Sequence, residues 1–588
     1  MSGGRGAVTG LLVLALGALG ACGGAAAVAT PGAAPPASPS AAAAPPPHTP
    51  QTAALPGLDI TLRPDGATGE LAVDLVASGP AEALSVLTLG EPGPAALARW
   101  MFRDEAGALP VDPASRAERV RFTRPAVGAL RVHAVFPAHP DPTGDAARIW
   151  VDPDRFEARG EAMLPLPEAF LDTPVPVHLV VETGSLGSAG TRAGSTFGAT
   201  GDHHFHARGR DLARATFAGG PAGMALFDAP EGHDEALWIG YTSFDPRPIA
   251  ADVASFRTAV RTVLGDAAAG PSTLLIVSDA RRQGAYHVER RSGGLVLHVG
   301  AAETWSAPLR ITVATAVLQR WLGGELWIGP EGERRGEAVW FTEGVSRFVA
   351  RDLLFRFGLI TPDELRAEVE GQTATLLTSP LAERTQTDLA KDPSRPGVVP
   401  LLAARGALYA ARVDALLRAK GGEKAGLTAL LRELLAEARQ KNAALPVRRW
   451  TELLTERLGS DAESAYQRFV ERGDGAPLPT DILGPCLRGT KRTYAAFSLG
   501  FDLRGTLDRP DPRVLRGLDP KGPGARAGLR EGDILVSARH EEGRADVHAV
   551  VVVQRDGTEK TLRYLPVGKR ADGLGFVRTD VPAERCVP

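Results

Sequence analysis

The chain has 588 residues, enough for roughly three or four domains at about 150 residues each. Its 66 basic and 69 acidic side chains give a net charge of −3, which argues against the strongly basic surface typical of nucleic-acid-binding proteins. Beyond the first residues, no stretch approaches the about 20 apolar residues of a membrane-spanning helix, so we expect a folded body without one.

The N-terminus has the layout of an export signal. Arg5 is followed by an apolar run and then by residues 19–22, LGAC, an order typical of signal peptides. The LGAC segment resembles the bacterial lipobox, which implies a signal peptide over 1–22 and lipidation of Cys22, with several acyl chains holding the protein on a membrane. The alternative is an ordinary secretory signal with an incidental cysteine. Because Gly23 is not an aspartate, we expect a cell-envelope location, on the outer membrane facing the periplasm or on the cell surface.

A tether and a β domain follow the signal. Residues 23–56 consist almost entirely of Ala, Pro, Ser and Gly, a composition that buries too little apolar surface to form a folded core. Residues 57–195 then show apolar residues at every second position in four segments, 58–62, 71–75, 130–136 and 175–181, which predicts half-buried strands. We expect an antiparallel β domain, similar to a sandwich.

The pattern changes to mixed α/β over residues 196–397 and to helical periodicity over 398–485, before strands and glycine turns return in 486–588. Two capping boxes are predicted, one at Thr361-Pro362-Asp363-Glu364 and one at Ser460–Glu463. In the mixed region, strands are predicted at 273–278 and 295–299. Helices are predicted at 248–264, at 307–322 and after Glu343. The fold class is therefore α+β with several domains.

Two cysteines besides Cys22, Cys486 and Cys586, lie at the two ends of the last segment. In an oxidising periplasm such a pair is expected to form a disulfide that closes one module. Two buried or free thiols are the alternative, because the sequence does not give the Cα separation on which a disulfide depends.

Three segments carry a resemblance to a known family. They are Val313–Gly324 (VATAVLQRWLGG), Ala338–Val349 (AVWFTEGVSRFV) and Arg405–Arg418 (RGALYAARVDALLR). In this order they resemble the glycyl-aminopeptidase family of zinc peptidases. The resemblance implies an N-terminal β domain, a thermolysin-like gluzincin α/β domain, a helical subdomain and a C-terminal PDZ domain, and it covers nearly all of the mature chain.

The zinc motif of that family is degenerate here. Its chemistry needs two histidines four residues apart on one helix, a glutamate base beside the first and a glutamate ligand downstream. Aligned on the motif, this sequence has Thr315, Ala316 and Gln319 at the first three positions and retains only Glu343. Ala403 stands where the family often has a tyrosine. A single carboxylate does not hold catalytic zinc, so we expect no metal site, no cofactor and an inactive homologue of a metallo-aminopeptidase.

Two alternatives to an inactive peptidase exist. The first is an alignment shifted by some residues, but the chain contains no His-Glu-x-x-His that a shifted alignment could use. Residues 202–206 (DHHFH), with His233 nearby, offer a metal site of another design, but they lie in a glycine-rich stretch that favours a solvated loop. No Gly-x-Ser-x-Gly nucleophile motif surrounds Ser346 or Ser185.

The last segment resembles a PDZ domain. Leu499, Gly500 and Phe501 match the loop whose N–H groups hold a peptide carboxylate, and residues 522–535 match the turn and strand after it. This implies that a peptide or protein C-terminus adds as a strand beside Phe501–Leu503. Between Ser537 and Val547 there is room for only a turn or a very short helix to form the opposite wall, so a purely structural module is the alternative.

The sequence thus favours a non-catalytic peptide-binding or scaffold lipoprotein of the cell envelope. A working metallo-aminopeptidase with unusual ligands, which would need zinc, and a purely structural envelope protein are the alternatives.

The lipidation of Cys22 is directly testable. In a bacterial host, the Cys22→Ser variant is expected to leave the membrane fraction, because it lacks the sulfur that carries the lipid. Fractionation and metabolic labelling with a radioactive fatty acid measure this, with Ser38→Ala in the tether as the control. Unchanged labelling of Cys22→Ser would contradict the assignment.

Overall fold

The structure is a computed structural model that describes residues 55–89, 97–116, 118–137, 149–187, 190–229, 232–240, 244–266, 270–279, 286–300, 303–330, 336–475, 478–507, 512–541, 544–582 and 585–586. The predicted signal peptide, Cys22 and all but the end of the predicted tether lie outside these residues.

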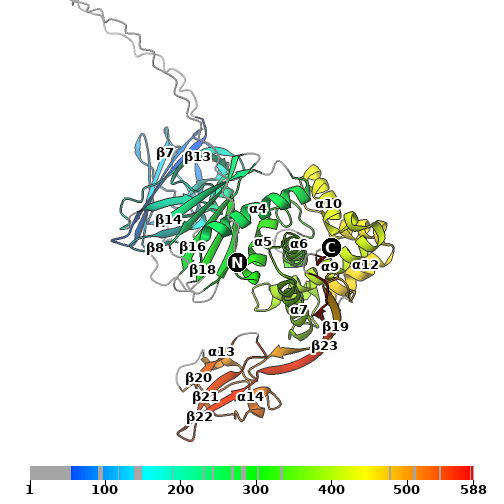
Figure 1. Cartoon of the computed structure of the whole chain (residues 1–588). Helices are drawn as coiled ribbons and strands as arrows, with labels where there is room; N and C mark the ends of the chain where they lie inside the picture. The colour runs from blue at the N-terminus through cyan, green and yellow to red at the C-terminus, as the bar shows by residue number, and fades with distance from the viewer. Residues whose placement is uncertain are drawn as a thin grey trace, which may run out of the picture. The chain divides into compact units, whose positions relative to one another are not determined.

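A mixed sheet begins the body. Within the described residues its strand order is β13-β11-β1-β2-β7-β4-β5, and it appears in blue and cyan in Figure 1. Its strands are β1 (Gly57–Asp65), β2 (Glu70–Ser78), β4 (Met101–Asp104), β5 (Gly107–Ala108), β7 (Leu130–Pro137), β11 (Val175–Val181) and β13 (Asp202–Ala207). Every second residue of β1 is buried, as the sequence predicts. The expectation of a fully antiparallel domain is wrong at one pair, because β1 and β11 run parallel, with Ile60 opposite Leu179.

A smaller sheet shares the core of this first sheet. It has the order β10-β3-β6 in the described part of the chain and consists of β3 (Val86–Thr88), β6 (Arg119–Arg121) and β10 (Leu166–Pro167). Leu87, Val120 and Leu166 of this sheet belong to one buried cluster with Ile60 and Leu75 of the first. Two sheets on one core form the sandwich-like arrangement that the alternating pattern indicates.

The next sheet has the order β17-β18-β16-β15-β14-β9-β8, with β12 paired to β14, among the described strands. Its members are β8 (Ile149–Val151), β9 (Phe156–Arg159), β12 (Thr191–Ser195), β14 (Thr216–Ala229), β15 (Gly232–Ile239), β16 (Thr273–Asp279), β17 (Tyr286–Arg291) and β18 (Gly294–Gly300). The chain passes back and forth between this sheet and the first one. β8, β9 and β12 belong to this sheet, whereas β11 and β13 belong to the first. The centre of this sheet is parallel and its β16 residues Leu274–Val277 are all buried, as expected for a strand covered on both faces.

Helices form the rest of the body. The larger ones are α4 (Pro246–Leu264), α5 (Ala307–Leu318), α6 (Ser346–Arg356), α7 (Pro362–Thr378), α9 (Val398–Gly421), α10 (Leu427–Lys441) and α11 (Val447–Leu458). The short ones are α2 (Gly160–Met163), η1 (Glu168–Phe170), α3 (Gly209–Ala213), η3 (Trp340–Val345, π-helical), α8 (Gln386–Leu389), η4 (Glu423–Ala425), α12 (Asp461–Tyr466) and η5 (Gln467–Glu471). None of the helices in the described residues is both long and apolar enough to cross a membrane. The mixed α+β architecture with β sheets first and helices after is confirmed.

The two predicted capping boxes differ in outcome. At Thr361 both reciprocal hydrogen bonds with Glu364 are formed, and α7 begins there. Ser460 makes no side-chain capping hydrogen bond, so that prediction is wrong. The reason is its backbone, which is already helical (φ −58°, ψ −20°), whereas a capping residue normally has extended backbone.

Two of the segments that carry the family resemblance cross each other at glycines. A Cβ on Gly406 of α9 would lie 1.9 Å from the carbonyl oxygen of Trp340, and one on Gly344 of η3 would lie 2.7 Å from the Cα of Gly406. The backbones of η3 and α9 therefore touch where no side chain fits.

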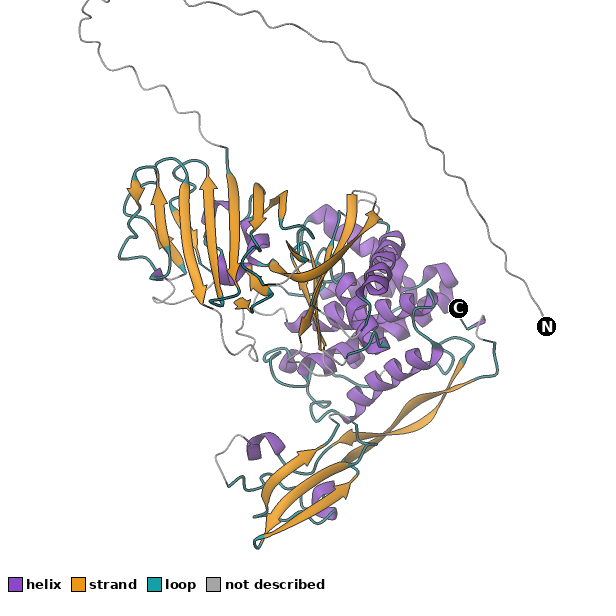
Figure 2. Cartoon of the chain, turned by 60° about the vertical axis from the view of Figure 1, so that its left-hand side comes forward, coloured by secondary structure: helices purple, strands orange, loops and turns teal. Residues whose placement is uncertain are grey.

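The C-terminal part is a long ribbon that ends in a small sheet (Figure 2). β19 (Leu487–Phe497) and β23 (Val567–Arg578) form the ribbon, and β20 (Ile534–Arg539), β21 (Ala549–Arg555) and β22 (Thr558–Tyr564) form the sheet, with α13 (Leu503–Leu507) and α14 (Pro523–Arg526) beside it. A disulfide joins Cys486 to Cys586 at the base of the ribbon, with 5.0 Å between the Cα atoms. Both cysteines belong to the main buried cluster of the helical body, and Glu370 of α7 accepts a hydrogen bond from the backbone N–H of Phe576 (2.8 Å).

The glycine crossing gives a stability prediction. Gly406→Ala should lower the free energy of unfolding by about 1–3 kcal/mol or more, because the added methyl overlaps the Trp340 carbonyl and forces η3 and α9 apart. Chemical denaturation measures this. The matched control is Gly371→Ala in α7, where a Cβ meets nothing within 4 Å. This control should be stabilising by about 0.5–1 kcal/mol, and equal effects of the two variants would refute the packing argument.

Candidate functional site

Helix α5 carries Thr315 and Ala316, the first two positions of the predicted degenerate motif, and all of its residues are buried except Pro308, Arg310 and Thr312. Ser306 caps its N-terminus by accepting a hydrogen bond from the N–H of Leu309, and Pro308 lies in the first turn. The helix ends at Leu318, one residue before Gln319, so the predicted extension to residue 322 is a turn rather than a helix. The second half of the helix, Val313–Leu318, is buried throughout, so the packing around it holds Thr315 and Ala316 in fixed positions.

Thr315 directs its hydroxyl into its own helix. The side chain is buried, and Oγ1 donates a hydrogen bond to the carbonyl oxygen of Ile311 at 2.7 Å. This back-bonding is the usual way in which a threonine inside a helix satisfies its donor. One position on, Ala316 presents only a methyl group, which neither binds a metal nor accepts a proton.

Gln319 and Glu343 come together. Gln319 follows the last turn of α5, and its Nε2 donates to the carbonyl oxygen of Thr342 at 3.1 Å. Glu343 is the next residue of η3, and its interaction with the Gln319 side chain acts to lower the pKa of its carboxyl group. The one glutamine therefore acts on two successive residues of the π-helical turn. Thr315 and Ala316 take no part in this contact.

Glu343 is a half-buried carboxylate. Burial raises its pKa, while the Gln319 hydrogen bond and the positive charges of Arg347 and Arg290 oppose that shift. Arg347 forms its own ion pair with Glu368, at 2.5 Å, and does not neutralise Glu343. The net effect favours the protonated form of Glu343 relative to a solvated glutamate. Ala403, at the family's tyrosine position, lies on α9 with its carbonyl oxygen against Gly344.

Across the part of the chain that the structure describes, no group of three or more His, Cys, Asp or Glu side chains is placed to hold a metal ion. The histidine run does not lie in a loop as expected. Residues 202–207 are strand β13, which pairs with β11 at the edge of the first sheet. The expectation failed because the glycines around the run hid its alternation, in which Asp202, His204 and His206 are exposed and the residues between them are more buried. His204 stacks on His178, and His233 lies 3.5 Å from Asp228 on β14.

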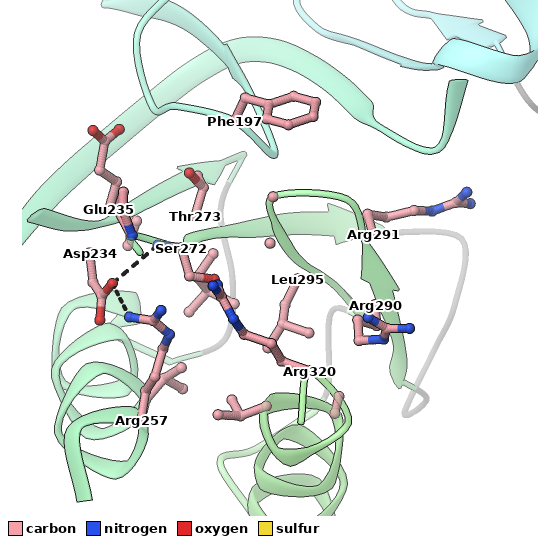
Figure 3. Close-up of a pocket in the computed structure, with 18 of the residues that line it drawn as sticks. Phe197, Asp234, Glu235, Arg257, Ser272, Thr273, Arg290, Arg291, Leu295 and Arg320 are labelled. Atoms are coloured by element: carbon pink, nitrogen blue, oxygen red, sulfur yellow. Dashed lines mark hydrogen bonds and ion pairs between the residues drawn. The ribbon is translucent and has the colours of Figure 1, made fainter. Parts of the chain in front are cut away.

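A cavity of about 440 Å³ adjoins α5 (Figure 3). Ala316, Val317 and Arg320 line it from the helix and the turn after it, and the opposite wall comes from the starts of β15, β16 and β18. Sequence reasoning missed this cavity and Arg320, because its walls come from segments far apart in the chain. The spacing of Ala316 and Arg320, one helical turn apart, was the available signal.

The loop that matches the PDZ pattern lies inside its own module. Leu499 and Phe501 belong to the buried cluster of the small sheet, and the carbonyl oxygen of Leu499 accepts a hydrogen bond from Tyr564 Oη at 2.7 Å. The N–H of Gly500 donates to Ser498 Oγ (3.1 Å). The expected strand over Phe501–Leu503 is not formed, since the chain bends there and enters α13. The reason is local: Asp502 caps this turn, accepting from the N–H of Gly505.

Comparisons with known proteins give the fold. No family model and no curated protein matches this sequence. Among solved structures, an aminopeptidase N family protein from Idiomarina loihiensis is similar over 88% of this chain and 98% of its own, with 15% identity and a TM-score of 0.65. An M1 zinc metallopeptidase from Deinococcus radiodurans matches 73% of this chain and 96% of its own, with 16% identity and a TM-score of 0.45. The likeness to the Idiomarina loihiensis structure shows that the chain has an aminopeptidase N-like fold.

The buried carboxylate predicts a pH effect. A raised pKa means that folded Glu343 binds its proton more tightly than the unfolded chain does, so wild-type stability falls as the pH rises from about 4.3 to that raised pKa. Glu343→Gln removes the titration and still accepts the Gln319 hydrogen bond. It should therefore be more stable than wild type at pH 7, and this advantage should shrink at pH 4.

Denaturant unfolding of both proteins at the two pH values measures the difference. The control is Glu452→Gln on α11, a glutamate with 43% of its side chain exposed, which should show no such pH-dependent gain. If Glu343→Gln is less stable than wild type at pH 7, the prediction is wrong, and the charged carboxylate of Glu343 stabilises the fold through a partner.

Proposed function

We propose that the chain is an exported lipoprotein, anchored through Cys22 at the outer membrane, whose peptidase-like body binds peptide or protein without cutting it. The observation that carries this is the Gln319 side chain, which donates a hydrogen bond to the carbonyl oxygen of Thr342 and interacts with the neighbouring Glu343. Zinc peptidases of this fold need a histidine where Gln319 stands, with its lone pair free for the metal.

The donor set does not fit zinc. The hydroxyl of Thr315 serves its own helix, and Ala316 has no polar atom. The amide of Gln319 presents N–H groups, which are donors, toward the one remaining carboxylate. Zinc sites use three protein ligands in catalytic centres, and these must be deprotonated, whereas burial favours the protonated form of Glu343. The proposal therefore includes no cofactor and no hydrolytic step.

Binding without catalysis is chemically consistent, because groups that hold a substrate differ from those that stabilise the transition state. We assign peptide binding to the body and not to the C-terminal module. The reason is that Leu499 and Phe501 are buried and the N–H of Gly500 already has an acceptor. The cavity beside α5 offers an open volume of the size that small ligands occupy. The even balance of basic and acidic residues supports peptides or proteins over nucleic acid as partners.

Metal analysis tests the loss of zinc chemistry. Tagless wild-type protein should contain no stoichiometric zinc and should leave aminoacyl reporter substrates intact. The triple variant Thr315→His, Ala316→Glu, Gln319→His should gain about one zinc per chain, because two imidazoles then join Glu343 in a three-ligand set. Elemental analysis after dialysis measures this.

The matched control adds Glu343→Gln to the triple variant, which should lose the metal again. Stoichiometric zinc in the wild type, with hydrolysis that a chelator abolishes, would refute the proposal.

A further inference from the structure

The cavity beside α5 is lined by more basic groups than acidic ones. Five arginines line it, namely Arg214, Arg257, Arg290, Arg291 and Arg320, together with the acids Asp211, Asp234 and Glu235. Each acid has a protein donor: Asp234 binds Arg257 and the N–H of Ser272, Glu235 the N–H of Ala199, and Asp211 the hydroxyl of Ser292. The carboxylates of the lining are therefore already engaged.

Arg320 has a weak hydrogen bond on this lining. Its Nη1 reaches the carbonyl oxygen of Gly270 at 3.4 Å, and Arg257 donates to that same oxygen. Two guanidinium groups thus converge on one neutral acceptor. Burial lowers the pKa of Arg257, and the nearby charge of Arg320 adds to that shift. Figure 3 shows Arg320 rising from the end of α5 into the middle of the lining, between Arg257 and Leu295. Because its acceptor is a neutral and shared carbonyl oxygen, Arg320 would form a stronger, charge-assisted hydrogen bond with an added anion.

Helix α5 offers Arg320 no acidic partner, since the residues Ala307–Leu318 include neither aspartate nor glutamate. Ala316 lies one turn before Arg320 and lines the same cavity. A glutamate at this spacing would form a favourable intrahelical pair, but Ala316 supplies only a methyl group. Asp266 interacts with Arg320 only through its charge, since its carboxylate accepts hydrogen bonds from Trp321 Nε1 and Arg439. An oxyanion from outside would give Arg320 a directly bonded acidic partner.

The apolar residues of the cavity lining indicate the chemical character of the rest of the ligand. Phe197, Phe227, Val253, Leu295 and Val317 present apolar surface around the charged centre, and about 440 Å³ is within the range of small-ligand pockets. Inorganic phosphate would leave this apolar surface unused, whereas a short peptide with apolar side chains covers it.

We infer that the cavity binds a short apolar peptide whose terminal carboxylate pairs with the guanidinium of Arg320. This inference rests on the proposed peptide-binding function and names the ligand group and the residue that selects it. The planar fork of arginine matches the two oxygens of a carboxylate, so a peptide amide is the natural comparison.

Calorimetric titration of the whole mature protein tests the assignment, with N-acetyl-Leu-Leu, its C-terminal amide and inorganic phosphate as probes. The free acid should bind at least about ten-fold more tightly than the amide, the difference that one charged hydrogen-bonded pair supplies. Arg320→Gln should reduce the acid to the affinity of the amide. Arg448→Gln, on the exposed face of α11 with 86% of its side chain exposed, is the matched control and should change nothing.

A second pair of variants does not depend on removing Arg320. Ala316→Glu places an internal carboxylate beside Arg320 and should weaken binding of the acid, while Ala316→Gln, of equal size, should not. Circular dichroism and thermal unfolding establish that each variant is folded.

Equal binding of the acid by wild type and folded Arg320→Gln would overturn the inference, as would equal binding of acid and amide, or no binding of the acid by wild type. Binding of phosphate without the peptide would overturn the peptide assignment. The readouts differ from those of the proposed function, which fails if zinc and hydrolysis are found whether or not Arg320 binds a carboxylate.

Discussion

The contact between the Gln319 amide and the Glu343 carboxylate joins the end of α5 to the π-helical turn η3. A buried carboxylate is costly unless donors or charges compensate it. Here a neutral amide and the more distant charges of Arg347 and Arg290 give partial compensation, and protonation supplies the rest. The aminopeptidase-like fold thus keeps this half-buried acidic residue through the amide, two neighbouring positive charges and protonation together.

The segments around this contact have structural roles that are independent of chemistry. Gly344 and Gly406 let η3 and α9 touch backbone to backbone. The indole of Trp340, in the same turn, packs edge-on against Tyr409 of α9 and Trp450 of α11. The packing of these segments therefore accounts for their glycine and aromatic residues without any catalytic role.

In the cavity beside α5, charge pairing is incomplete at Arg320. Many charged groups in the described body lie in pairs, such as Arg257 with Asp234 or Arg347 with Glu368. Arg320 departs from this pattern because its helical neighbour is Ala316 and its acceptor is a shared carbonyl oxygen. The C-terminal ribbon shows the opposite case, since Glu370 of α7 satisfies both the N–H of Phe576 and the guanidinium of Arg492.

The sequence by itself determined the local elements, because alternation, helical periodicity and caps act over a few residues. It predicted β1, β2, β7 and β11, the helices α4 and α5, and the capping box of α7. It also marked Thr315, Ala316, Gln319 and Glu343 as the positions to inspect. Only the tertiary structure decided which of them meet, because Gln319 and Glu343 are brought together by the packing of α5 on η3.

The contacts between segments that are far apart in the chain could not be predicted from the sequence either. The parallel pairing of β1 with β11, the strand β13 in a glycine-rich stretch and the buried loop at Leu499–Phe501 depend on which distant segments supply hydrogen-bond partners. The cavity around Arg320 arises in the same way, since no local pattern shows that Arg257 and Arg320 approach one carbonyl oxygen. Secondary-structure propensity depends on adjacent residues, whereas the electrostatic environment of a charged group depends on the groups that the tertiary fold places around it.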